Sequence, residues 1–177
     1  GAAVTEIALP HVGFARAVFA VIVLAEAFSV HERYLKARPD DYGPDVRARL
    51  EAGALILASQ YLRAQRVRRL LQADFQAALA QVDVIVTPTC PIPAPRISEE
   101  DLRKDVGGES AADALLRFAR PVNLVGLPAV SVPCGFTPSG LPVGLQVIGR
   151  AYDETTVLRA ASAYERATPW RQRQPPV

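Results

Sequence analysis

The sequence predicts an α/β fold in which a mixed β-sheet is flanked by helices. Two short apolar runs, at residues 129–132 and 142–149, are rich in β-branched side chains and are bounded by Gly and Pro. Such runs are typical of buried strands, and the turn residues between them indicate a hairpin-like connection. Longer segments before and after them carry apolar residues at helical spacing. Helices that bury one face against a common sheet account for both patterns.

Composition limits the classes of protein to consider. Of the 177 residues, 50% are hydrophobic and 21% are charged, which is ordinary for a soluble globular protein with one core. A net charge of +2 gives no reason to expect nucleic acid or an acidic membrane as a partner. The apolar run at residues 17–27 is shorter than the about 20 residues that span a bilayer. We expect a cytoplasmic protein, with Cys90 and Cys134 as reduced thiols.

The first half of the chain reads as one strand and two helices. Alternating apolar residues at 4–9 indicate a short strand. Residues 12–36 form a helix whose apolar face is wide enough to predict that it is well buried. Pro44 suits the first turn of a second, long helix over residues 45–81. Gly53 interrupts its apolar stripe and would let another element approach closely.

The second half begins with an apolar strand at residues 82–86, which we expect in the middle of a sheet covered on both faces. A proline-rich segment follows and has to leave the sheet. Residues 98–108 are charged and Gly-rich, which predicts a mobile surface loop, and residues 110–118 a short helix. Asp153 is a good N-cap for a last helix before a polar tail at 170–177.

No side chain stands out as catalytic. His11 and His31 are the only histidines, and nothing at catalytic spacing accompanies them, so we expect structural roles. Lys36 and Lys104 lie in polar surroundings that keep an amine protonated. Cys134 has no cationic neighbour that would activate a thiol. The sequence also shows no metal-ligand spacing and no Gly-rich phosphate loop, so we expect no metal and no cofactor.

Three polar residues next to predicted strands are candidates for lining a substrate pocket. Thr87 and Thr89 follow the strand at residues 82–86, and Asn123 precedes a Gly-Leu-Pro turn. Such loop positions commonly shape pockets in α/β folds. The alternative is that the three side chains satisfy backbone groups in their own turns. The sequence leaves both interpretations open.

A longer motif carries a resemblance. The segment N-L-V-G-L-P-A-V-S-V-P-C-G-F at residues 123–136, followed by G-L-P-V-G-L-Q-V-I-G at 140–149, resembles the C-terminal core of the amidase signature family. The Thr-Pro-Thr at 87–89 extends the match. These are serine hydrolases of amides, and the family includes the A subunit of the glutamine-dependent tRNA amidotransferase. The resemblance implies that residues 1–177 are a single partial domain, the C-terminal part of the amidase signature fold.

The resemblance also implies what is missing. The family uses a Ser, a second Ser in a cis peptide and a Lys, all in its N-terminal half, and no Gly-Gly-Ser-Ser-Gly-Gly-Ser stretch occurs here. The chain would then be an amidase fragment that is inactive alone, with the missing N-terminal half as its partner. Apolar surface left open in this way predicts self-association into a homo-oligomer. Arg49 matches a basic position that meets an acidic substrate group in some branches of the family.

Three functional hypotheses remain. The first is a general amidase, which converts an amide to a carboxylate plus ammonia or an amine. The second is the A subunit of the amidotransferase. That branch tends to have an Asp shortly before Pro-Val-Asn-Leu, and the Ala-Leu-Leu-Arg-Phe at residues 114–118 favours the first hypothesis. The third is a non-catalytic scaffold or binding protein of the amidase fold.

Overall fold

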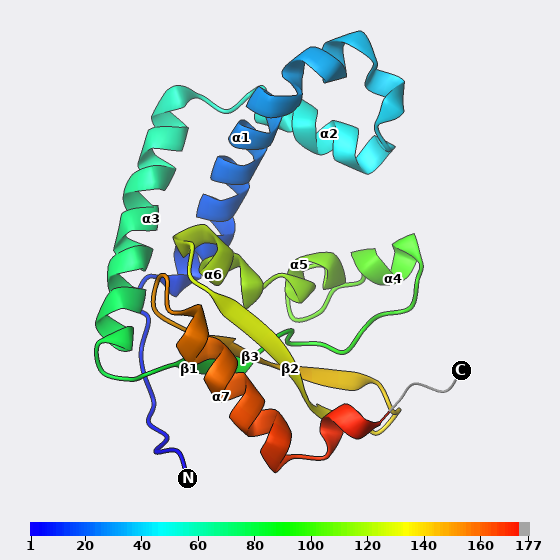
Figure 1. Cartoon of the computed structure of the whole chain (residues 1–177). Coiled ribbons are helices and arrows are strands. Elements are labelled where there is room, and N and C mark those ends of the chain that lie inside the picture. Colours follow the sequence, from blue (N-terminus) through cyan, green and yellow to red (C-terminus); the bar gives the residue numbers. More distant parts are fainter. Residues whose placement is uncertain (174–177) are drawn as a thin grey trace. The chain divides into compact units, whose positions relative to one another are not determined.

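The computed structural model describes residues 1–173 and divides the chain into two compact units. The helical unit is Leu9–Asp74, and the sheet unit combines Gly1–Ala8 with the chain from Phe75 onward. Figure 1 labels the elements of both. Each unit is described by itself.

The sheet unit is built on three strands in the order β1-β3-β2, with both pairs antiparallel. The strands are β1 (Ile85–Pro88), β2 (Ala129–Phe136) and β3 (Pro142–Ile148). The pairing of β2 with β3 confirms the predicted hairpin, and the combination of this sheet with flanking helices confirms the α/β class. Among the described residues the sheet is antiparallel, whereas a mixed sheet was predicted.

The placement of the first strand differs from the prediction. β1 is an edge strand, and Val86 on it is 52% exposed, so a central position covered on both faces is wrong. The strand also starts later than predicted, because Val82 still donates its backbone N–H to Ala78 O in the turn that ends the preceding helix. The central position belongs to β3, which arrives later in the chain and pairs with both neighbours.

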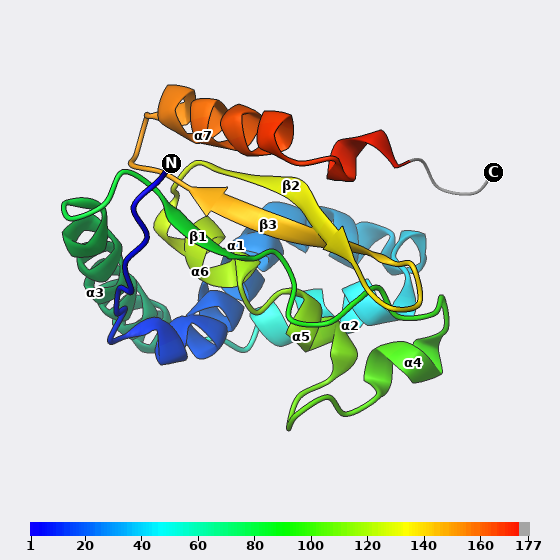
Figure 2. The ribbon, with the colours of Figure 1, turned by 90° about the horizontal axis from the view of Figure 1, so that it is seen from below.

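Helices cover both faces of the sheet (Figure 2). Helix α7 (Glu154–Ala167) lies on one face and begins at Asp153, whose side chain accepts from Thr156 N–H as predicted. Gly149 lets it approach, because a Cβ there would stand 2.4 Å from Val157 Cγ2. On the other face lie α5 (Ala111–Leu115) and α6 (Ala119–Val125). The helix predicted at residues 110–118 is confirmed as α5 but is shorter, because residues 116–118 form a turn before α6 begins.

Three further segments of this unit bear on the sequence-based expectations. The strand predicted at residues 4–9 is wrong: this segment has no strand partner, and Val4 is 89% exposed. The segment 98–108 contains α4 (Glu99–Arg103), capped by Ser98; its mobility stays a prediction. Of the predicted polar tail, Trp170–Gln172 form a 3₁₀ turn, and residues 174–177 lie outside the described part of the chain.

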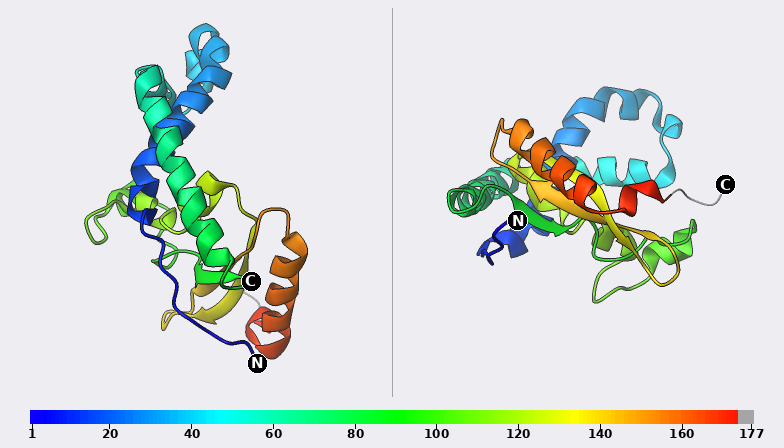
Figure 3. Two further views of the ribbon diagram at one scale, coloured as in Figure 1. Left: turned by 90° about the vertical axis from the view of Figure 1, so that its left-hand side faces the viewer. Right: turned by 60° about the horizontal axis from the view of Figure 1, so that its bottom comes forward.

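The helical unit holds two 3₁₀ turns and three longer helices, of which α3 ends in the sheet unit. The turns are Val12–Phe14 and Pro39–Asp41, and the helices are α1 (Ala15–Ala37), α2 (Pro44–Gly53) and α3 (Ala58–Leu79). The predicted helix at residues 45–81 therefore breaks after Gly53, and Gln60 caps the new start by accepting from Leu57 N–H at 2.9 Å. The close approach expected at Gly53 is present, because a Cβ there would stand 2.2 Å from Leu24 O. Figure 3 shows α1 and α2 in two further views.

Helix α1 is less buried than its composition predicted. Ala15, Val18 and Ile22 are buried, but Phe14 at its start is 56% exposed and Val30 is 70% exposed. By length and composition alone, the helical stretch Val12–Ala37 could cross a membrane, since it is longer than the apolar run considered above. The core helix of a soluble protein passes the same test.

Candidate functional site

A row of polar side chains crosses one face of the sheet. In the strand register Thr87 of β1 lies opposite Gln146 of β3, and Gln146 lies opposite Ser131 of β2. Residues directly opposite each other present their side chains on the same face, and every second residue of a strand returns to that face. Thr89 and Gly144 therefore share the face with this row. We call Thr87, Thr89, Ser131 and Gln146 the polar row.

The hydroxyls of Thr89 and Ser131 meet over Gly144. Their oxygens are 2.5 Å apart, although the two residues are 42 positions apart in the sequence. A Cβ on Gly144 would lie 2.7 Å from each of these oxygens, so the hydroxyl pair occupies the space that a side chain would need. The backbone N–H of Thr89 donates to Gly144 O at 2.8 Å, which holds Thr89 beside the central strand.

Gln146 fixes the other end of the row. Its side chain is buried, and Nε2 donates to Thr87 Oγ1 at 3.0 Å and to Phe118 O at 3.3 Å. A threonine hydroxyl that accepts from an amide still has its own proton to donate. Gln146 also links the sheet to the residue that precedes α6. The polar row can thus present hydroxyl donors and acceptors. Its position is fixed by the Thr89–Gly144 backbone hydrogen bond and by the Gln146–Phe118 contact.

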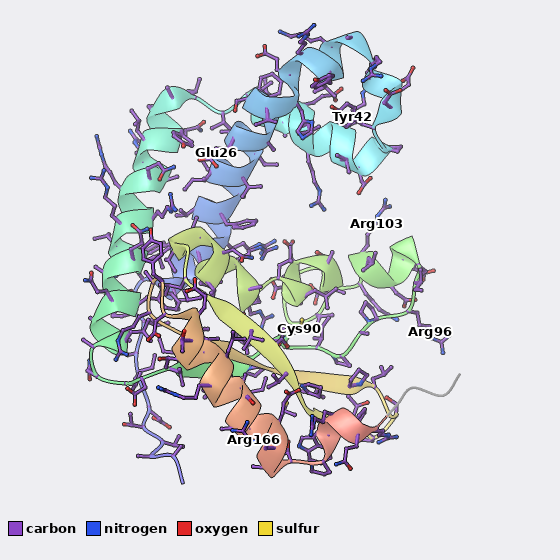
Figure 4. The ribbon with its side chains drawn as sticks, viewed as in Figure 1. Glu26, Tyr42, Cys90, Arg96, Arg103 and Arg166 are labelled. Carbon is purple, nitrogen blue, oxygen red and sulfur yellow. The ribbon has the colours of Figure 1, made fainter. Side chains whose placement is uncertain are left out.

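The helices beside this face are joined by a partly buried ion pair. Arg120, at the start of α6, is 6% exposed and forms an ion pair with Asp113 of α5. Asp113 also donates its backbone N–H to Ser110 Oγ at 3.1 Å, which caps α5. Cys90, just beyond β1, donates its thiol to Leu115 O at 3.4 Å and lies near α5 in Figure 4. Both cysteines are free thiols.

The candidate residues from the sequence are not all brought together. Thr87 and Thr89 belong to the polar row, and their hydroxyls bond side chains on other strands rather than backbone groups of their own turn. Asn123 is exposed on α6, and within residues 1–173 no hydrogen bond joins it to the row. Arg49 is exposed on α2, in the helical unit. Roles for these four residues in substrate binding stay predictions.

Sequence reasoning missed Ser131 and Gln146. A signal for both was present, because each is a polar residue beside valines in a strand, in A-V-S-V and L-Q-V. Alternation of this kind places the polar residues on one face of the sheet. The contact between Ser131 and Thr89 could not be predicted from this alternation, because it depends on which strands pair.

The histidines make contacts outside the polar row. In the helical unit His11 donates its backbone N–H to Asp74 Oδ2 at 2.8 Å, and its Nδ1 lies 3.0 Å from Asp74 Oδ1. Burial of the Asp74 carboxyl raises its pKa, but the His11 hydrogen bonds and ring charge outweigh burial, and the pKa is lowered overall. His31 Nδ1 lies 3.1 Å from the Tyr42 hydroxyl. Over the described residues, no group of three His, Cys, Asp or Glu gathers to hold a metal.

The chain has the fold of solved amidase structures. The family model described as Amidase matches residues 1–158, and the chain belongs to the amidase family. This confirms the resemblance found in the motifs.

The chain is similar in sequence to curated proteins that all carry the same name. The A subunit of glutamyl-tRNA(Gln) amidotransferase from Thermodesulfovibrio yellowstonii is 38% identical over 96% of this chain and 39% of its own length. The protein of the same name from Myxococcus xanthus is 38% identical over 100% of this chain and 40% of its own. The chain thus spans about 40% of the length of these curated relatives.

Solved structures agree with this assignment. A structure titled as an amidase superposes with a TM-score of 0.86 at 30% identity, covering 94% of this chain and 38% of the other. The A subunit of the Thermotoga maritima glutamyl-tRNA(Gln) amidotransferase gives 0.65 at 36% identity, covering 91% and 34%.

Proposed function

We propose that this chain is the C-terminal part of an amidase-family enzyme that cleaves an amide to a carboxylate plus ammonia or an amine. Its contribution is one wall of the amide-binding pocket, formed by the polar row. The observation that carries this proposal is the hydroxyl pair of Thr89 and Ser131, held over Gly144 on an accessible part of the sheet. An amide presents both an acceptor and donors, and hydroxyls both donate and accept.

The test of this wall uses the protein that contains this chain and its catalytic half. Replacing the hydroxyls, as Thr89→Val and Ser131→Ala, should lower kcat/KM for its amide by about tenfold each, as expected for the loss of about 1.4 kcal/mol of hydrogen bonding. The matched control is Ser139→Ala in the β2–β3 turn, which removes a similar pair, Thr137 Oγ1 to Ser139 Oγ at 2.8 Å. Unchanged kinetics in both row variants would refute the pocket wall.

We further propose that the 177 residues alone have no amidase activity and need the remaining part of the family fold as a partner. The support is that the residue types the family uses for catalysis do not occur here at usable spacing. Purified chain should release no ammonia from simple aliphatic and aromatic amides. Turnover that disappears in Cys134→Ala or in a serine variant would contradict this. We expect the enzyme to act in the cytoplasm, in line with its two free thiols.

A second candidate is the A subunit of a glutamine-dependent tRNA amidotransferase. The names of the curated relatives at 38% identity favour it. The apolar stretch at residues 114–118 and the higher TM-score with the amidase structure favour the general amidase. Ammonia release from glutamine, compared with release from simple amides by the same enzyme, discriminates the two. Binding without turnover of either class would favour the scaffold hypothesis.

A further inference from the structure

The hydrogen bonds of Gln146 have a fixed direction. Its Nε2 lies 3.3 Å from Phe118 O, and a carbonyl oxygen can accept a hydrogen bond but cannot donate one. The carboxamide nitrogen, and not the carboxamide oxygen, therefore faces both Phe118 O and Thr87 Oγ1, which is 3.0 Å away. Gln146 is only 6% exposed, so turning the carboxamide over would place its oxygen against Phe118 O with little water to compensate.

This direction determines the role of the Thr87 hydroxyl. The carboxamide nitrogen only donates, so Thr87 Oγ1 accepts from Gln146 and the hydroxyl proton has to be donated to a different acceptor. Within residues 1–173 the bond from Gln146 is the only hydrogen bond of the Thr87 side chain, which is partly exposed. Gln146 thus leaves Thr87 as a donor that has no acceptor inside the described chain.

The other end of the polar row has no fixed direction. The hydroxyls of Thr89 and Ser131 pair with each other at 2.5 Å, and either oxygen can be the donor. Each arrangement leaves one hydroxyl proton to donate, but on a different residue. The polar row therefore combines one hydroxyl whose proton is directed by Gln146 with a pair that adapts to its ligand.

We propose that Gln146 is a positioning residue that makes Thr87 a hydrogen-bond donor to an acceptor oxygen of the bound amide substrate. The inference rests on the proposed function in taking the polar row as a wall of the amide pocket, and it adds which hydroxyl donates and which residue directs it. Thr87 contacts the substrate, and Gln146 acts through Thr87. A carbonyl, ether or carboxylate oxygen fits beside Thr87, whereas an apolar group there leaves the hydroxyl proton unpaired.

A double-mutant cycle in kcat/KM tests this role in the enzyme that contains these residues. Thr87→Val removes the donor and should lower kcat/KM about tenfold, whereas Thr87→Ser keeps the hydroxyl and should stay within about twofold of the unmodified enzyme. Gln146→Glu, assayed at an alkaline pH at which the carboxyl is ionised, presents an acceptor in place of the Nε2 donor. Thr87 then donates to the new carboxylate, and kcat/KM should fall at least about tenfold. In the Thr87→Val background the same change should cost less than about threefold, because the hydroxyl through which Gln146 acts is absent.

A second variant covers the case in which the buried carboxylate prevents folding. Gln146→Met has a similar volume and no donor, so the Thr87 hydroxyl can rotate freely. The value of kcat/KM should fall about threefold when Thr87 is present and stay unchanged in the Thr87→Val background. The matched control is Gln81→Glu, which removes an exposed bond from Nε2 to Ala77 O at 3.2 Å and should leave kcat/KM unchanged.

A second measurement uses the 177-residue chain and no substrate. Nuclear magnetic resonance distinguishes the two Nε2 protons of Gln146, of which one faces Thr87 and the other faces Phe118. Thr87→Val should shift only the first of these resonances, and Thr87→Ser should restore it. A spectrum in which neither resonance shifts in Thr87→Val would show that Gln146 does not direct Thr87, and the inference would be wrong.

The kinetic outcomes separate this inference from the proposed pocket wall. Additive losses for Gln146→Glu and Thr87→Val, or no loss in Thr87→Val, overturn the positioning role even where Thr89→Val and Ser131→Ala lower kcat/KM. Coupled losses at Gln146 and Thr87, together with unchanged kinetics in Thr89→Val and Ser131→Ala, support the positioning role and refute the role proposed for the hydroxyl pair.

Discussion

Strand β3 and helix α1 are both strongly apolar, yet the structure treats them differently. β3 has a hydrogen-bonded neighbour on each edge and helices over both faces, and Val147 and Ile148 on it are at most 2% exposed. Helix α1 buries one side and leaves Val23 and Val30 open. A central strand needs a neighbouring strand on each edge to complete its hydrogen bonds, and the segments that connect these strands cover its two faces. A helix completes its hydrogen bonds within itself, so forming the helix does not require that every apolar side be covered by another element.

A similar contrast appears at the glycine in each unit that lets another group approach closely. In the sheet unit, Gly144 makes room for two side-chain hydroxyls that are candidates for function. In the helical unit, Gly53 makes room for the backbone of α1 itself. The first glycine shapes a surface, and the second holds a helix crossing together. Variants at these and related positions test how independent the two units are.

The largest effect is expected for Gly53→Ala. The new Cβ would lie 2.2 Å from Leu24 O and 2.9 Å from Phe28 Cβ, so α1 and α2 must separate. Overpacking of this kind costs about 2–3 kcal/mol, which urea unfolding followed by circular dichroism would detect. The control is Gly13→Ala, where nothing lies within 4 Å of the added atom. If Gly53→Ala were as stable as the control, the close crossing would be absent in solution.

Arg150 tests the sheet unit. Its Nε donates to Leu79 O at 3.0 Å and its second guanidinium nitrogen to Val82 O at 2.9 Å, so it satisfies carbonyls at the end of α3. Arg150→Ala should cost about 1–2 kcal/mol, because hydrogen bonds from a charged donor are lost at a partly exposed site. The comparison is Arg159→Ala on the exposed side of α7, for which little change in the urea midpoint is expected. Equal effects would mean that the cap contributes nothing.

The His11–Asp74 contact makes the stability of the helical unit depend on pH. Because the pKa of Asp74 is lowered in the folded protein, its contribution is fully present above the ordinary carboxyl value of about 3.9 and is lost as pH falls through the folded value. Asp74→Asn should therefore reduce stability at neutral pH by about 1 kcal/mol and flatten the acid limb. Thermal unfolding between neutral pH and pH 3 measures both. An acid limb that is as steep in the variant would assign it to other carboxylates.

Sequence patterns identified the elements more reliably than their partners. The β2–β3 hairpin, the Asp153 cap and Gly53 as a point of close approach follow from local chemistry, and all three are present. The prediction of one long helix at residues 45–81 was wrong. In a sequence, a glycine that ends a helix cannot be told from one inside a helix unless the cap of the next helix, here Gln60, is recognised. The edge position of β1 depends on which later strand pairs with it, which no local pattern contains.

The candidate site shows the same division. Thr87 and Thr89 were found because they follow an apolar strand, and Ser131 and Gln146 could have been found by alternation. Their convergence depends on register: Thr89 reaches Ser131 only because β3 lies between β1 and β2 and carries a glycine at residue 144. Cross-strand contacts of this kind arise from tertiary pairing rather than from the spacing of residues along the chain.

The smallest expected effect on stability concerns a contact at the tip of the β2–β3 hairpin in the sheet unit. Arg173 stacks on Phe136, with its guanidinium carbon 4.1 Å from the ring centroid, and the Trp170 ring lies edge-on to Phe136 at 6.3 Å. Because this cation–π contact is exposed, Arg173→Ala should cost only about 0.5–1 kcal/mol. Trp170 is the only tryptophan in the chain, so its fluorescence reports this tip directly.

Arg173→Ala should change the Trp170 emission and shift the fluorescence-detected midpoint slightly. In Gly53→Ala the midpoint detected by circular dichroism should move, while the midpoint detected by Trp170 fluorescence should stay unchanged. If both variants instead moved both signals together, the sheet and helical units would unfold as one cooperative body. The contrast between them would then be one of packing alone, with no difference in independent stability.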